Sequence, residues 1–141
     1  MRWRTAAGTD ETVHPSVRIL YVGIMQTESQ NKQAQWAALC HASALVILFG
    51  LPFGNVLAPL IIWLVKRNEF PLLDTHGKEA LNFQLSVTLY GLISVILVFV
   101  LVGFILLFVL FIFFLVNVVR AAIAAGNGES YTYPLTIRFI T

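Results

Sequence analysis

Apolar residues gather in two long blocks, from Trp36 to Val65 and from Ala80 to Val119, with scarcely a charge inside either. A helix rises about 1.5 Å per residue and the hydrocarbon core of a bilayer is about 30 Å thick, so about 20 residues cross it. The second block is about twice that length. It must fold back, and Gly103 lies near its midpoint. We predict one helix from about Leu72 to Leu101 and another from about Phe104 to Ala125.

The first block is interrupted by the turn-forming string GLPFGN, residues 50–55. A proline inside a straight helix costs about 3 kcal/mol. Two interpretations follow: two short helices joined by a turn, or a single kinked and tilted span. The short second helix, about Val56 to Val65, covers only about 15 Å. The first pair therefore either spans fully or forms a shallow hairpin that thins the bilayer locally.

The basic residues distinguish four spans from three, because cytoplasmic loops carry an excess of Lys and Arg. With four spans, all nine Lys and Arg residues lie on the side of the termini. With three, Lys66, Arg67 and Lys78 move to the face opposite Lys32. We therefore predict an all-α membrane protein with four transmembrane helices arranged as two hairpins. Both termini are then cytoplasmic, in a bacterial inner membrane.

The two ends of the chain differ from the middle. Residues 1–24 show no clear period, and Met25 offers an alternative start, so they are interpreted as a loose tail or an over-extended gene start within a polar N-terminal tail, 1–32. The membrane domain is 33–126. In 127–141, apolar and polar residues alternate with a period of two, which predicts an amphipathic extended tail along the bundle or the membrane surface. Pro134 argues against a central strand.

Composition narrows the functional classes. Apolar residues make up 58% of the chain and charged residues 11%, against about 25% charged in an ordinary soluble domain. The net charge of +2 suggests no nucleic-acid partner, since phosphate binding needs clustered Lys and Arg. The single cysteine, Cys40, excludes an internal disulfide and a cysteine-rich metal site. The bilayer is thus the one partner that composition indicates.

One polar string, NEFPLLDTHGKEALNFQ at residues 68–84, carries nearly every ionisable group close to the membrane. On a helical wheel its polar residues form a stripe that runs several turns into the bilayer. Such a stripe should face protein or water, because an unpaired polar group in hydrocarbon costs several kcal/mol. We predict that it faces the last helix, with Arg120 near Asn82 and Glu79, and Asn117 near Ser86. The candidate polar motif comprises His41, Asp74, His76, Lys78, Glu79, Asn82, Gln84, Asn117 and Arg120.

Several chemistries are compatible with this motif. His41, His76 and Glu79 suit a zinc or iron site, but no second ligand pair or HExxH motif accompanies them. Glu79 and His76 suit acid–base chemistry, but no nucleophile motif accompanies them. Lys78 and Arg120 suit a lipid phosphate or a conduit. The fourth interpretation is that these groups pair with one another and set helix register. We favour it and assign no catalytic residue, metal or cofactor.

From Trp36 onward the chain resembles a known family on four strings: AALCHASAL, LAPLIIWLVKR, DTHGKEALNFQ and GNGESYTYPLTIRFI. They are similar to small bacterial members of the family of the twenty-kilodalton subunit of the chloroplast inner-envelope protein translocon. The resemblance covers residues 33–141 and implies four membrane helices. Its motif departs at Glu79, where bacterial members often have Gln. The positions it marks are His41, Asp74, His76, Lys78, Glu79, Asn82, Phe83, Gln84, Tyr133 and Pro134.

The resemblance implies a protein related to a translocon subunit, although function does not transfer with a fold. We expect a non-enzymatic accessory or scaffold subunit of the inner membrane, with a membrane-protein partner or self-association. The alternatives are a small transport or lipid-handling component that uses the polar stripe and, last, a membrane enzyme.

Overall fold

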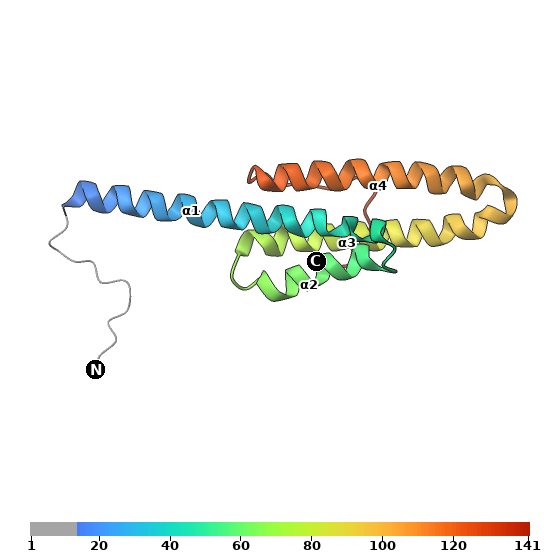
Figure 1. Cartoon of the computed structure of the whole chain (residues 1–141), viewed down its shortest axis with the longest axis horizontal. Coiled ribbons are helices and arrows are strands. Elements are labelled where there is room, and N and C mark those ends of the chain that lie inside the picture. The colour runs from blue at the N-terminus through green and yellow to red at the C-terminus, as the bar shows by residue number, and fades with distance from the viewer. Residues whose placement is uncertain (1–13) are drawn as a thin grey trace, which may run out of the picture.

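The computed structural model describes residues 14–141, and within them every regular element is a helix. Two hairpins lie side by side (Figure 1). The first pairs α1 with α2, and the second pairs α3 with α4. The helices are α1 (Pro15–Ala42), the 3-10 segment η1 (Ser43–Phe49), α2 (Gly54–Lys66), α3 (Pro71–Ile96), the 3-10 segment η2 (Leu97–Val100) and α4 (Val102–Gly126).

Helix α1 begins upstream of the position that the sequence indicated. Pro15 occupies its first turn, where a missing N–H costs nothing, and the His14 side chain accepts a hydrogen bond from Ser16 N. The interpretation of 15–24 as a loose tail is therefore wrong, because these residues continue the helix that Met25 was expected to open. The remainder of that predicted tail, 1–13, lies outside the described residues.

The first hairpin consists of two short helices joined by a turn, as one of the two sequence interpretations proposed. Gly50 ends η1 with φ 79° and Phe53 precedes α2 with φ 58°. Both lie in the left-handed region, which reverses the chain within a few residues. The single kinked span is thereby excluded.

The second hairpin reverses where the sequence predicted, beside Gly103. Leu101, at φ 65°, separates η2 from α4. A Cβ on Gly103 would lie 2.2 Å from Ser94 O, so only glycine fits this close approach of the two helices. The two arms, Pro71–Val100 and Val102–Gly126, are both long and apolar enough to cross a membrane. Only 22% of the most apolar window of each arm is buried inside the protein.

Small side chains allow α1 to pack closely on the second hairpin. Ala37, Cys40, Ala121 and Ala125 are fully buried between α1 and α4 or α3. Small residues at helix interfaces let backbones approach, which is typical of membrane bundles. Large apolar side chains instead cover the outside; Phe99 and Phe104, for example, are 94% and 58% exposed.

Candidate functional site: a polar seam closed by the C-terminal segment

The polar stripe on α3 is buried, although its side chains are polar. His76, Glu79, Asn82 and Ser86 are each less than a tenth exposed. The segment that covers them is the C-terminal one, residues 129–141, which has no helix or strand and returns along α3 after α4 ends. We call these four α3 residues and the groups they bind in the segment the polar seam.

The seam binds the backbone of the C-terminal segment. Glu79 Oε1 accepts a hydrogen bond from Tyr133 N at 2.6 Å, and Ser86 Oγ accepts one from Ile137 N at 2.8 Å. Asn82 Oδ1 accepts from Phe139 N at 2.9 Å. An irregular backbone cannot satisfy its own polar groups, and in hydrocarbon each unsatisfied one is costly. The side chains of α3 supply these partners, so the segment can lie against the bundle without forming a strand.

Tyr133 anchors the segment. Its ring is 2% exposed and stacks on Phe83 with centroids 3.9 Å apart. The rings of Tyr131 and Tyr133 pack edge to face, with their centroids 5.0 Å apart. Burial, followed by the proximity of Cys40, Tyr131 and Glu79, raises the pKa of the Tyr133 phenol well above its usual value. The hydroxyl therefore stays protonated at neutral pH.

Two histidines extend the seam into α1. The Tyr133 hydroxyl lies 2.9 Å from His41 Nδ1, and His41 Nε2 lies 3.0 Å from His76 Nδ1. This gives a buried chain of three groups, in which each contact carries one proton. Its far end, His76 Nε2, is buried without a hydrogen-bond partner in residues 14–141.

The seam does not form the metal site that His41, His76 and Glu79 suggested. The two imidazoles face one another, and the Glu79 oxygens are occupied by Tyr133 N and by Arg138. Among the residues that the structure describes, no three His, Cys, Asp or Glu side chains are grouped to hold a metal ion.

The predicted partner of the stripe is wrong. Glu79 forms its ion pair with Arg138 of the C-terminal segment, while Arg120 is exposed on α4. Asn117 bonds to Phe113 O of its own helix and to the Tyr131 hydroxyl rather than to Ser86. The polar side chains of the stripe bond to the C-terminal segment, not to α4. Arg138 was missed, although it is the cation in the alternating tail and Glu79 is the acid of the stripe.

At the basic end of the bundle, Asp74 joins two helices. It accepts a hydrogen bond from Trp63 Nε1 at 3.0 Å and pairs with Lys78 at 3.1 Å, one helical turn on. Gly77 lies under the Trp63 ring, where a Cβ would come within 2.2 Å of Cδ1. Asp74 and Lys78 are four residues apart on one helix, which is the spacing of a helical ion pair, whereas the contact with α2 depends on the fold.

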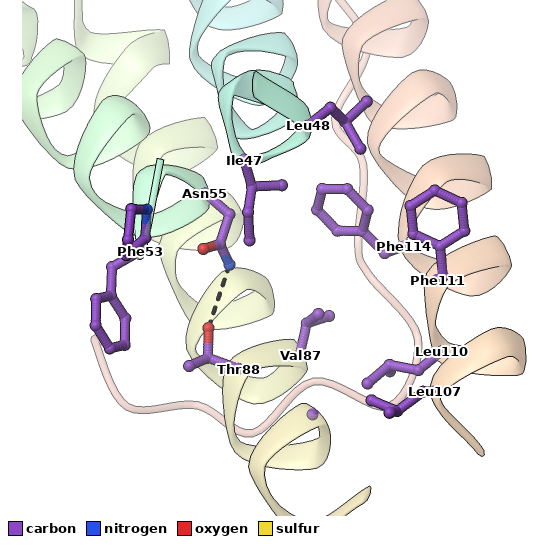
Figure 2. Close-up of a pocket in the computed structure, with 12 residues that line it drawn as sticks. Ile47, Leu48, Phe53, Asn55, Val87, Thr88, Leu107, Leu110, Phe111 and Phe114 are labelled. Carbon is purple, nitrogen blue, oxygen red and sulfur yellow. Dashed lines mark hydrogen bonds between the residues drawn. The ribbon is translucent and has the colours of Figure 1, made fainter. Parts of the chain in front are cut away.

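Gln84 lies apart from the seam, on the side of α3 that faces α2. Asn55 Nδ2 donates to Gln84 Oε1 at 3.3 Å. It also donates to Thr88 Oγ1 at 3.2 Å (Figure 2). Gln84 Nε2 is buried without a hydrogen-bond partner in the described chain. The sequence indicated Asn55 only as a turn former. It is instead the buried link between the start of α2 and the middle of α3.

An apolar groove lies beside this link, below the turn of the first hairpin (Figure 2). Phe53 and Asn55 line one side of it. Leu107, Leu110 and Phe111 of α4 line the other. Apart from Asn55 and Thr88, its lining offers only hydrocarbon and aromatic surface, which suits an apolar chain rather than a charged ligand.

Comparison with known proteins identifies a family. The family model described as "Magnetosome magnetite crystal formation protein family" (MamF_MmsF) matches residues 32–140, which include most of the bundle and nearly all of the C-terminal segment. The resemblance to the chloroplast translocon subunit family is therefore wrong. All four strings that suggested that resemblance lie within residues 32–140. No curated protein and no solved structure matches the chain.

Proposed function

The chain belongs to the magnetosome magnetite crystal formation protein family, and we propose that it is a non-enzymatic integral membrane protein that assists crystal formation from within the magnetosome membrane. The observation that carries the proposal is the family match, because it includes the two membrane-length helices and the polar seam together. Crystal formation is what the family description names, and the accessory role is our inference.

The way the seam uses its polar groups supports a role without catalysis. Glu79 binds Tyr133 and Arg138, and Asn82 and Ser86 bind the backbone of the C-terminal segment. A general base or nucleophile needs an atom free to meet a substrate. Here the polar atoms hold the C-terminal segment in place.

We propose that both hairpins enter the membrane from the cytoplasmic side, with both termini in the cytoplasm and with α3 and α4 crossing it. The link between α2 and α3 lies at the same end of the bundle as the end of α4 (Figure 1). Arg67 lies in this link, Lys66 ends α2 just before it, and Lys78 lies near the start of α3. The opposite turns, at Pro52 and Leu101, carry no charge. The positive-inside rule then assigns the basic end to the cytoplasm.

A labelling experiment tests this topology. Cys40 is buried, so Cys40→Ala with Asn68→Cys gives a single exposed thiol in the link. We expect an impermeant maleimide to label it only after the cells are opened, and a matched Phe53→Cys variant to stay unlabelled from the cytoplasmic side. Labelling of position 68 from outside intact cells would contradict this topology.

Complementation tests the function. The chain should restore crystal size when it is expressed in a magnetite-forming bacterium that lacks its own member of this family, as measured by electron microscopy. A chain shortened after residue 128, which removes the segment that closes the seam, serves as the matched comparison. Unchanged crystals with the full chain present in the membrane would contradict the proposal.

Purification in detergent, followed by identification of what co-purifies, then distinguishes the remaining functional classes. A stoichiometric protein partner supports a scaffold role, and self-association supports a homo-oligomeric one. A retained lipid supports the second candidate function, lipid handling, which the apolar groove favours. A stoichiometric metal or chromophore would favour an enzyme and contradict the accessory role.

A further inference from the structure

The first hairpin stops part of the way along the second. At the start of α2, Asn55 Nδ2 bonds to Thr88 Oγ1 of α3 at 3.2 Å, which fixes the level of the first turn. From Thr88 the chain continues through η2 to Val100, about 18 Å further at helical rise. The α3–α4 turn therefore projects well past the first hairpin (Figure 1).

The C-terminal segment turns back at the same level. Its turn lies at Pro134 and Leu135, and the Tyr90 hydroxyl donates to Leu135 O at 2.9 Å. Tyr90 is only two residues after Thr88. The segment then runs back toward the basic end, where Ile140 meets Asn82. Two independent elements thus enter from the basic end and reverse at one depth.

This gives the molecule two different cross-sections. Between the basic end and Thr88 it contains four helices and two passes of the C-terminal segment. Beyond the two reversals, which lie near Thr88 and Tyr90, the part of the chain that the structure describes continues only as the ends of α3 and α4. Leu107, Leu110 and Phe111 line the groove at this step, on the α4 side (Figure 2).

The depth of the step lies inside a bilayer. Trp63 and Asp74 mark the basic interface, because indole rings prefer that position and the two are hydrogen-bonded there. From Asp74 to Thr88 is about 21 Å at helical rise, which is short of the hydrocarbon thickness of about 30 Å. The first hairpin and the C-terminal segment therefore displace lipid mainly in the leaflet at the basic end.

We propose that the protein is a membrane wedge. It binds best to a strongly curved bilayer whose convex side is the side of the protein's basic end. Its wide part separates the lipids of one leaflet, and acyl chains of the other leaflet fill the step beside α4. A flat bilayer must thin or bend to cover that step, whereas a curved one matches it. The inference rests on the proposed membrane insertion and adds to it a preferred membrane shape.

Sorting between vesicles of different size tests the wedge. Full-length Cys40→Ala/Asn68→Cys protein carries a reducible dye and is reconstituted with phosphatidylethanolamine and phosphatidylglycerol into small sonicated and large extruded vesicles. An impermeant reductant reports which molecules have position 68 outside. We expect these molecules to be several-fold denser per membrane area on the small vesicles, and inward-facing molecules to be depleted there. Equal densities for both orientations, or the reverse order, would overturn the wedge.

A depth measurement keeps the test independent of sorting. Phe53 and Val100, at the two turns, are 64% and 65% exposed, so a nitroxide on a cysteine at either site disturbs little packing. At position 53 we expect high accessibility to oxygen and low accessibility to a water-soluble nickel complex. Position 100 should show the reverse. A water-exposed label at position 53 with a lipid-embedded link at 68 would overturn the wedge.

The outcomes separate the two proposals. If both labels and position 68 are in water, membrane insertion itself fails, and the proposed function fails with it. If both hairpins insert but the molecules show no preference for curvature, only the wedge fails. Cross-linking through Phe104→Cys gives a further check, because it detects dimers in which a second copy fills the step. Such dimers, if they sorted equally to all vesicles, would also overturn the wedge.

Discussion

The Asn82 side-chain amide forms hydrogen bonds with both the backbone N–H and the backbone carbonyl of Ile140. The Asn82 side-chain oxygen accepts from Ile140 N at 2.7 Å, and its Nδ2 donates to Ile140 O at 2.8 Å. The asparagine thus replaces the neighbouring strand that an extended backbone normally needs. The residue type suits this geometry, because a side-chain amide carries an acceptor oxygen and a donor nitrogen on one carbon, as a peptide group does.

Replacing this amide should release the end of the chain. Asn82→Ala leaves three backbone groups of residues 139 and 140 without partners, and each buried unsatisfied group costs about 1–3 kcal/mol. We expect faster amide exchange and proteolysis at 137–141 and a lower unfolding temperature in detergent. Thr75→Ala, at an exposed site on the same helix, is the control. Unaltered exchange at the C-terminus would contradict the assigned contact.

Glu79 should couple to Arg138 and not to Arg120. Groups in contact typically show interaction energies of about 0.5–3 kcal/mol, whereas distant pairs add within about 0.3–0.5 kcal/mol. We expect Glu79→Gln and Arg138→Gln to be non-additive in unfolding free energy, because removing either partner ends the same ion pair. The matched cycle with Arg120→Gln should be additive. Coupling to Arg120 instead would restore the pairing across the hairpin.

The elements that depend on local sequence were predictable. Apolar block length and turn residues gave the two hairpins, and Gly103 gave the second turn. The polar stripe on α3 was also predicted to face protein, because hydrocarbon excludes it. Helical periodicity contains that information within a few turns of chain.

The partner of the stripe could not be predicted in the same way. A period of two in 127–141 indicates an extended segment but does not say whether it lies on the membrane surface or inside the bundle. That choice depends on long-range contacts such as Tyr133 with Phe83 and with His41. The start of α1 was missed for a different reason, because the first-turn residue Pro15 is followed by no clear apolar period that would mark a helix.

Gly77 should tolerate no side chain. A Cβ there would lie 2.2 Å from Trp63 Cδ1, and the ring is held by its hydrogen bond to Asp74. Overpacking of this kind costs about 1–3 kcal/mol. We expect Gly77→Ala to lower the unfolding temperature and change the tryptophan emission. Gly91→Ala is the matched control on the same helix, because its Cβ would make only an ordinary contact, 3.8 Å from Leu110 Cδ2. Equal effects at both positions would contradict close packing of Trp63.

The Tyr133 hydroxyl should contribute to stability apart from the ring that carries it. Tyr133→Phe keeps the ring on Phe83 but removes the contact with His41 Nδ1, so we expect a loss of about 1–3 kcal/mol. Tyr133→Ala also removes the buried ring and should cost about 3–5 kcal/mol, as aromatic truncations in cores do. Thermal unfolding in detergent measures both changes. Equal losses would show that the hydroxyl alone anchors the segment.

The same substitution makes a pH prediction. Burial raises the pKa of folded Tyr133 well above the ordinary value of 10.0, so the unfolded phenol ionises first as pH rises. The folded state then loses the stability associated with this group above about pH 10, and keeps it fully below that pH. We expect the unfolding temperature of the wild-type chain to fall more steeply above pH 10 than that of Tyr133→Phe, with parallel curves between pH 7 and about 9. Tyr21→Phe, at an exposed tyrosine, should follow the wild type. Curves that stay parallel up to pH 11 would place Tyr133 in contact with water and contradict its burial beneath the C-terminal segment.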